Sequence, residues 1–274
     1  MNQITSSLKL SVKLLKEYKF RIAIPALVDM LFFFVYGFVF SLIFNRIGNY
    51  LMELYNLVMR SPEEVQGSLL SQGLFGALRA TPELSQLFNR VIIWLFLLAI
   101  AVYIVYSAFQ GLSWKLSYGI AGRKISYPRF LVQFFSVNLF WLVFYIIYQI
   151  IAYLLELRAM ISINISQTPA PSLSLVLWLY LLVLAYFMLI SYSLIGRYKP
   201  LKIIANSFRL GFSKAKTLFP SYLLILVVFF ILNFILILSL RISPTLMFII
   251  GVITVFPAMT LARVFFNLVI SKIA

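Results

Sequence analysis

Asp29 is the only acidic residue inside a stretch apolar enough to cross a membrane, which makes it the first candidate for chemistry in this sequence. A charged side chain within a bilayer is costly and usually has a specific role. Arg263 ends the last apolar stretch, and we expect it on the same side of the membrane as Asp29. Three interpretations stay open: an ion pair that joins the first and last helices, solvation of Asp29 at the membrane interface, and an ion or proton site.

Three amide side chains also fall within stretches that we expect to cross the membrane: Asn138, Gln149 and Asn233. Amides inside a bilayer usually form hydrogen bonds to neighbouring helices. The structural interpretation of these residues is therefore helix packing. The functional alternative is a polar path for a small solute.

The composition argues against most catalytic and metal-binding chemistry. The 274 residues include no Cys and no His, so the chain has no thiolate nucleophile and lacks the commonest general base and metal ligand. There is no G-x-x-x-x-G-K-[ST] phosphate loop and no G-x-S-x-G motif. We therefore predict no catalytic residue, no metal site and no cofactor, and we expect a protein that is not an enzyme.

The elements that must position the polar residues are long apolar helices. Of the residues, 63% are hydrophobic and 11% charged, against about 45–50% apolar and about 25% charged in a soluble domain. Six stretches have a length near the roughly 20 residues that cross a bilayer. They cover residues 22–44, 91–109, 134–155, 173–195, 220–240 and 245–262. We predict an all-α, polytopic membrane protein with a single integral membrane domain over residues 1–274.

The charges are sorted between the two ends of these helices. With both termini on one side, 17 of the 23 Lys and Arg residues fall on that side, and five of the seven acids fall on the other. Short membrane loops rich in Lys and Arg stay in the cytoplasm. The sequence therefore predicts a multi-pass protein of the cell membrane with cytoplasmic N- and C-termini.

The segments between the spans predict further helices. Residues 201–219 place apolar side chains 3, 4, 4, 3 and 4 positions apart with basic residues opposite, which is typical of a helix lying in the membrane interface. Residues 1–20 show a weaker version of this pattern. We predict three helical hairpins, each preceded by a basic cytoplasmic interfacial helix, including helices at 1–20 and 200–219. Residues 45–90 predict an outer cap of short helices.

The basic interfacial helices are the predicted binding surface for anionic lipids. Lys and Arg close to a membrane surface attract anionic head groups. The same surface suits a protein partner or a second copy of the chain. Nucleic acid is not expected, because a positive-inside topology already explains the charge. The candidate residues are Lys202, Arg209, Lys214, Lys216, Lys9, Lys13 and Lys16.

Two runs carry a resemblance to known proteins. The run KIIANSFRL at residues 202–210 leads from a basic helix into a long apolar stretch, and residues 8–29 end in IPALVD. Both resemble elements of prokaryotic six-span membrane proteins, including the membrane domain of some glycerophosphoryl diester phosphodiesterases. The resemblance implies an all-helical membrane domain and supplies no catalytic residues, since the phosphodiesterase chemistry of those proteins lies in a separate soluble domain.

Two functions fit these patterns. The first is a non-enzymatic membrane-organising or accessory subunit that binds anionic lipids or a protein partner through its basic cytoplasmic face. The alternative is a transporter or permease component for a small solute. A transporter is expected to have a polar cavity that reaches the middle of the membrane between broken helices. An accessory subunit is expected to have a dry interior with its grooves facing lipid.

Overall fold

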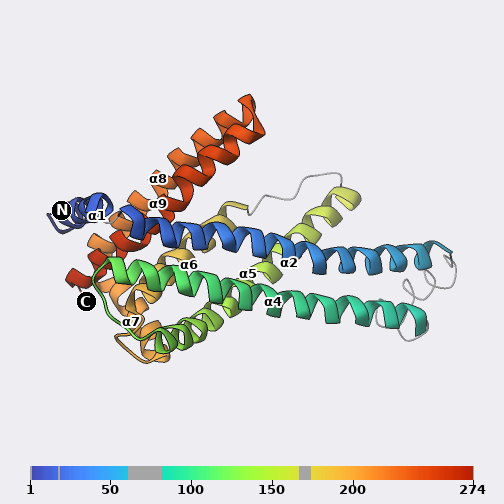
Figure 1. Ribbon diagram of the computed structural model, residues 1–274. Helices are drawn as coiled ribbons and strands as arrows, with labels where there is room; N and C mark the ends of the chain where they lie inside the picture. Colours follow the sequence, from blue (N-terminus) through green and yellow to red (C-terminus); the bar gives the residue numbers. More distant parts are fainter. Residues whose placement is uncertain (1, 18, 61–81, 167–173, 274) are drawn as a thin grey trace. The chain divides into compact units, whose positions relative to one another are not determined.

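The computed structural model describes residues 2–17, 19–60, 82–166 and 174–273, and this part of the chain contains helices and no strand (Figure 1). The helices are α1 (Asn2–Glu17), α2 (Lys19–Arg60), α4 (Pro82–Ile120), α5 (Tyr127–Ser166), α6 (Ser174–Leu194), α7 (Pro200–Ser213), α8 (Ala215–Ile242) and α9 (Pro244–Ile273). Six of them, α2, α4, α5, α6, α8 and α9, are long and apolar enough to cross a membrane. The prediction of an all-α chain with six such helices is confirmed.

The chain divides into two compact units, one of Met1–Leu31 with Ser107–Ala274 and one of Phe32–Tyr106. Helices α2 and α4 contribute residues to both. In the smaller unit the two helices contact each other through rings: the Phe32 and Tyr106 ring centroids are 5.9 Å apart. Further along, the Arg90 guanidinium lies 5.7 Å from the centre of the Tyr50 ring. The single integral membrane domain stays a prediction.

Helices α2 and α4 are longer than predicted, which corrects the expected outer cap. Residues 45–60 continue α2 and residues 82–90 begin α4, so neither segment forms a separate short helix. Residues 45–60 contain no proline that would end the helix, and apolar side chains continue at helical spacing. The rest of the predicted cap lies outside the described residues.

The middle hairpin has no interfacial helix before it, and this part of the prediction is wrong. Helix α4 runs to Ile120 and α5 begins at Tyr127. Gly122 ends α4 with a φ of 79°. The Gly122 and Arg123 amides donate back to the carbonyl oxygens of Gly119 and Tyr118, at 3.2 and 3.0 Å. This glycine-terminated arrangement closes the helix, and only six residues remain before α5.

The helix predicted over residues 200–219 is divided at Lys214. Helix α7 ends at Ser213, and α8 begins at Ala215 with Pro220 inside it. Pro200 starts α7 after an extended Lys199, as expected at the first position of a helix. Part of the predicted apolar stripe packs against protein: the Phe208 ring contacts the rings of Trp141 and Phe187, whereas Leu201 and Phe212 are exposed. The buried residues are Ile203, Ile204, Ser207 and Gly211.

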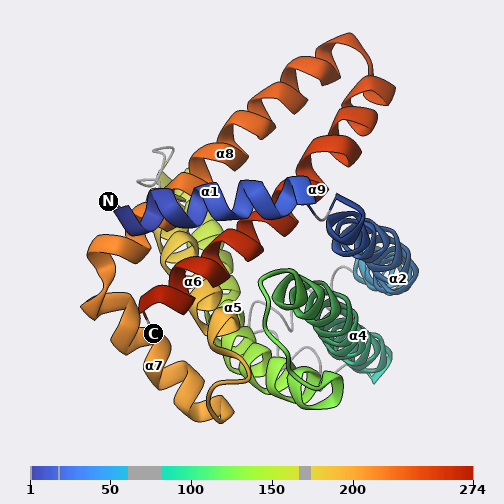
Figure 2. The same ribbon diagram turned by 60° about the vertical axis from the view of Figure 1, so that its left-hand side comes forward.

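The larger unit is built around aromatic side chains of α4, α5 and α6. The Tyr192 ring lies 4.8 Å from the Phe134 ring and 5.5 Å from the Trp114 ring, measured between centroids. Tyr118 and Phe130 make a similar contact at 5.3 Å. Helices α8 and α9 lie side by side as a hairpin, and α1 lies across α9 (Figure 2). This core also includes Phe265, Phe266, Val269 and Ile270 of α9.

Candidate functional site

A buried ion pair between α2 and α9 is the centre of the candidate site. Arg263 Nη1 lies 2.6 Å from Asp29 Oδ2, and Arg263 Nη2 lies 2.9 Å from Asp29 Oδ1. The planar guanidinium therefore donates to both carboxylate oxygens, which is the strong geometry for this pair. The Asp29 side chain is fully buried, and that of Arg263 is 6% exposed. The structure thus brings together the two residues that we considered as an intramembrane pair.

Two side chains of α4 complete the contacts of the guanidinium. Arg263 Nη1 also donates to Ser113 Oγ at 2.6 Å, and Nη2 donates to Gln110 Oε1 at 2.8 Å. Gln110 Nε2 donates to Asp29 Oδ1 at 3.3 Å, so this amide contacts both members of the pair. Ser113 Oγ donates to the carbonyl oxygen of Pro25 at 3.3 Å. One closed network of hydrogen bonds therefore joins α2, α4 and α9.

The Trp114 ring also lies beside this network. Its centroid is 5.9 Å from Arg263 Cζ, within the distance of a cation–π contact. Trp114 is buried, and it also contacts the ring of Tyr192. The indole thus connects the ion pair to the aromatic core of the larger unit.

This arrangement is suited to holding charge in place. The two formal charges cancel, and both carboxylate oxygens already accept hydrogen bonds. A buried ion is tolerated when its partner and additional hydrogen bonds satisfy it. Burial of Asp29 within the protein is incompatible with simple solvation at an interface. The geometry gives no support to an ion or proton site, and it supports a structural pair.

Gln110 and Ser113 were missed by the sequence reasoning. The predicted second span ended at residue 109, whereas α4 continues to Ile120. Ser107, Gln110, Ser113 and Ser117 are buried and lie 3, 3 and 4 positions apart, so they form one polar stripe along α4. The same spacing can be read from the sequence once the helix is extended by three turns. This stripe is the signal that would have indicated the partners of Arg263.

Asn138 belongs to a second buried network, between α4, α5 and α6. Asn138 Nδ2 donates to Ser107 Oγ at 2.6 Å, and Tyr192 Oη donates to Asn138 Oδ1 at 2.8 Å. Tyr118 Oη donates to the Tyr192 carbonyl oxygen at 2.7 Å. Such bonds hold neighbouring helices together when the side chains are away from water. Asn138 therefore holds neighbouring helices together, as its structural interpretation predicted.

The other two amides do not join Asn138. Gln149 and Asn233 are exposed on α5 and α8. Gln149 Nε2 donates to Tyr145 Oη, one turn earlier on its own helix, at 2.5 Å. These positions do not support a polar path shared by the three residues.

The candidate basic residues lie at the surface of the larger unit. On α1, Lys13 Nζ lies 3.6 Å from the Glu17 carboxylate, and both side chains are largely exposed. The Lys16 side chain lies outside the described part of the structure. The exposed members of the set are Lys9, Lys13, Lys202, Arg209, Lys214 and Lys216.

Arg123 differs from these exposed basic residues, because its side chain is partly buried. Its Nη1 donates to the Ser193 carbonyl oxygen at 2.9 Å, and its guanidinium lies 5.0 Å from the Tyr118 ring centroid. Burial lowers the pKa of Arg123 below its ordinary value; the Tyr118 hydroxyl opposes this shift, and the neighbouring Arg197 adds to it. The guanidinium remains charged, because the ordinary pKa of arginine is so high. Arg123 therefore secures the loop between α4 and α5 against the end of α6.

The described residues contain no group of three or more His, Cys, Asp or Glu side chains that could hold a metal ion. The chain is a polytopic membrane protein. No family model, curated protein or solved structure matches it in the comparisons with known proteins. Its function must therefore be argued from the placement of its own residues.

Proposed function

We propose that this protein is a non-catalytic integral membrane protein that binds anionic lipids through basic residues on its cytoplasmic face. The observation that carries the proposal is the surface of α7. Lys202 and Arg209 are exposed on this helix, and so are the apolar side chains of Leu201 and Phe212, at 83% and 73%. Exposed basic and apolar side chains on one short helix are typical of a helix at the membrane interface.

The uneven distribution of Lys and Arg between the two sides of the predicted topology also supports lipid binding. The segments that hold α1, α7 and the α4–α5 loop contain most of the Lys and Arg residues, and a six-span topology places all three on one side. In this proposal that side is the cytoplasm, where anionic lipids create a negative surface potential. The protein would thereby organise lipids or act as an accessory subunit at the inner leaflet.

The transporter alternative receives less support from the polar residues. A solute path needs polar side chains that are free to contact the solute. Asp29, Arg263 and Asn138 are instead buried and satisfied by protein partners. Gln149 and Asn233 face outward. The resemblance to six-span membrane domains fits a membrane domain without its own catalytic residues.

The test measures lipid preference of the purified protein in mild detergent. Native mass spectrometry would compare binding of phosphatidylglycerol and phosphatidylcholine to the wild type and to a double variant, Lys202→Gln with Arg209→Gln. We expect the variant to lose about 30-fold of its preference for the anionic lipid, since each Lys or Arg near an anionic surface contributes about 1 kcal/mol. The preference should also fall with salt.

A matched control removes the same charge elsewhere. Arg46 and Arg241 are exposed basic residues that the charge sorting assigns to the other side of the membrane. Arg46→Gln with Arg241→Gln should leave the preference within about twofold of the wild type, because these side chains lie away from the proposed surface. Equal losses in both double variants would refute the proposal. A nucleotide-binding subunit that co-purifies in stoichiometric amount would favour the transporter component.

A further inference from the structure

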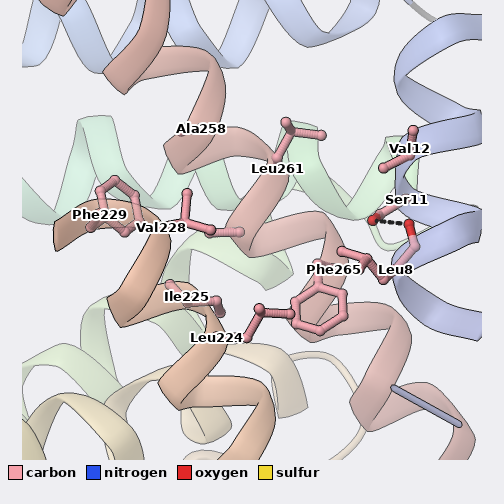
Figure 3. A pocket seen from close by; sticks show the side chains of 11 residues that line it. Leu8, Ser11, Val12, Leu224, Ile225, Val228, Phe229, Ala258, Leu261 and Phe265 are labelled. Carbon is pink, nitrogen blue, oxygen red and sulfur yellow. Dashed lines mark hydrogen bonds between the residues drawn. The ribbon is translucent and has the colours of Figure 1, made fainter. Parts of the chain in front are cut away.

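An apolar groove of about 150 Å³ lies among α1, α8 and α9 in the larger unit (Figure 3). Its walls come from three segments that are far apart in the sequence. The lining residues are Leu8, Ser11, Val12, Leu224, Ile225, Val228, Phe229, Ala258, Leu261, Ala262 and Phe265. The groove is open to the surroundings of the protein along part of its length, because Val228 and Val12 are exposed.

The lining excludes a polar occupant. Ser11 is the one polar residue in it, and its hydroxyl donates to the Leu8 carbonyl oxygen at 2.8 Å, as the dashed line in Figure 3 shows. Among the described lining residues, no side-chain hydrogen-bond donor is therefore left for a solute. A lining of Leu, Ile and Phe favours apolar guests over water. Such a space suits a segment of hydrocarbon chain.

Small residues account for the space between the helices. Ala258 and Ala262 are one turn apart on α9, so their methyl groups leave room beside Phe229 and Leu224 of α8. Pro257 lies inside α9 immediately before Ala258 and lacks the amide of a regular helix. Helix α1 lies across α9 (Figure 2) and contributes Leu8, Ser11 and Val12 to the lining.

Positive charge lies on the same helix as the α1 residues that line the groove. Lys9 follows the lining residue Leu8, and Lys13 follows the lining residue Val12; both lysines are exposed. Lys272 Nζ donates to Ser6 Oγ at 2.8 Å, which adds a third ammonium group at this helix. Glu17, the one acid in residues 2–17, lies against Lys13. The exposed side of α1 therefore carries a positive charge that is complementary to a phosphate.

We infer that the groove binds one phospholipid, with an acyl chain between α8 and α9 and its anionic head group at Lys9. The inference rests on the proposed lipid-binding function and names a site for it on α1, separate from Lys202 and Arg209 of α7. Lipid at this place would hold α1 against the α8–α9 hairpin. Each buried methylene group adds to the affinity, and the lysine selects the anionic head group.

The test uses the intact protein in nanodiscs with phosphatidylglycerol that carries a diazirine in its acyl chain. After irradiation, mass spectrometry of peptides would locate the cross-links. We expect them to concentrate on residues 224–229 and 258–265. Val228→Trp fills the groove and should lower cross-linking there to the level of other lipid-facing segments. Val227→Trp is the matched control: Val227 is exposed on α8 but does not line the groove, so its cross-links should stay at the wild-type level.

The head group is tested with Lys9→Gln. This variant should lower the preference for phosphatidylglycerol over phosphatidylcholine by about fivefold, while chain cross-links from phosphatidylcholine remain. Melting temperatures in detergent would show whether the variants are folded. If Val228→Trp does not fold, Ala258→Leu gives a second way to fill the groove. Cross-links spread evenly over the lipid-facing helices, and unchanged by groove-filling variants, would overturn this site. The lipid preference due to Lys202 and Arg209 would still stand in that case. Cross-linked dimers joined through α8 or α9 would instead identify a second copy of the chain as the occupant.

Discussion

Arg263 binds both carboxylate oxygens of Asp29, a residue 234 positions earlier in the chain. The contact joins the first and last of the six candidate membrane-spanning helices. Gln110 and Ser113 bring α4 into the same network. Because the four side chains satisfy one another, the pair is a structural connection that fixes which helix ends meet.

Removing the charge of Asp29 is therefore expected to destabilise the protein strongly. Asp29→Asn leaves the Arg263 guanidinium buried without its counter-ion, and breaking a buried pair in this way costs about 3–5 kcal/mol. The measurement is the midpoint of thermal unfolding in detergent. A melting temperature equal to that of the wild type would contradict the structural role of the pair.

Two comparisons separate this effect from a general loss of charge. Glu17→Gln removes a carboxylate from an exposed ion pair on α1, and we expect a change within about 0.5 kcal/mol. The double variant Asp29→Asn with Arg263→Gln removes both buried charges. It should be more stable than the sum of the two single changes predicts, because neither ion is then left unpaired.

Gly211 is expected to tolerate no side chain. A Cβ at this position would lie 2.5 Å from Phe187 Cε1, and the Phe187 ring is itself buried. The Gly211 carbonyl oxygen also accepts a hydrogen bond from Tyr186 Oη at 2.8 Å, which holds α7 close to α6. Gly211→Ala should therefore destabilise the protein by about 1–3 kcal/mol, the usual cost of overpacking.

Gly37 provides the control for this prediction. It lies within α2, and a Cβ there would meet no atom within 4 Å. Gly37→Ala should leave stability unchanged or raise it by up to about 1 kcal/mol, through better helix propensity. Thermal unfolding of both variants in the same detergent gives the comparison. Similar melting temperatures for the two would show that the α6–α7 contact is looser than the structure indicates.

Asn267 is expected to limit stability. It is fully buried on α9, one turn after Arg263, and neither polar atom of its amide has a hydrogen-bond partner among the described residues. A buried polar group without a partner costs about 1–3 kcal/mol. Asn267→Leu has a similar volume without polar atoms and should raise the melting temperature. A lower melting temperature for Asn267→Leu, together with an unchanged one for Asn267→Asp, would show that a bound ligand or water occupies the amide.

The sequence alone determined the class of the protein and the approximate places of its helices. Hydropathy is a local property, so six apolar stretches could be recognised without knowing how they pack. The absence of Cys and His, which is also visible without the fold, excludes a thiolate nucleophile and an imidazole base or metal ligand. Helix ends were harder to predict: α2 and α4 continue beyond their apolar stretches, because a helix does not require apolar side chains, and α4 ends at the Gly122 turn.

Only the tertiary structure decided which polar residues meet. Asp29 and Arg263 could be proposed as a pair because each was unusual in its own segment. The polar stripe of α4 shows that Gln110 and Ser113 share a face, but only the structure shows that this face meets the pair. The three amides of the predicted polar path looked equivalent in sequence, yet Asn138 is buried while Gln149 and Asn233 are exposed. The rotation of each helix about its own axis determines this difference. That rotation is set by packing between segments as many as 234 residues apart, as the pair shows.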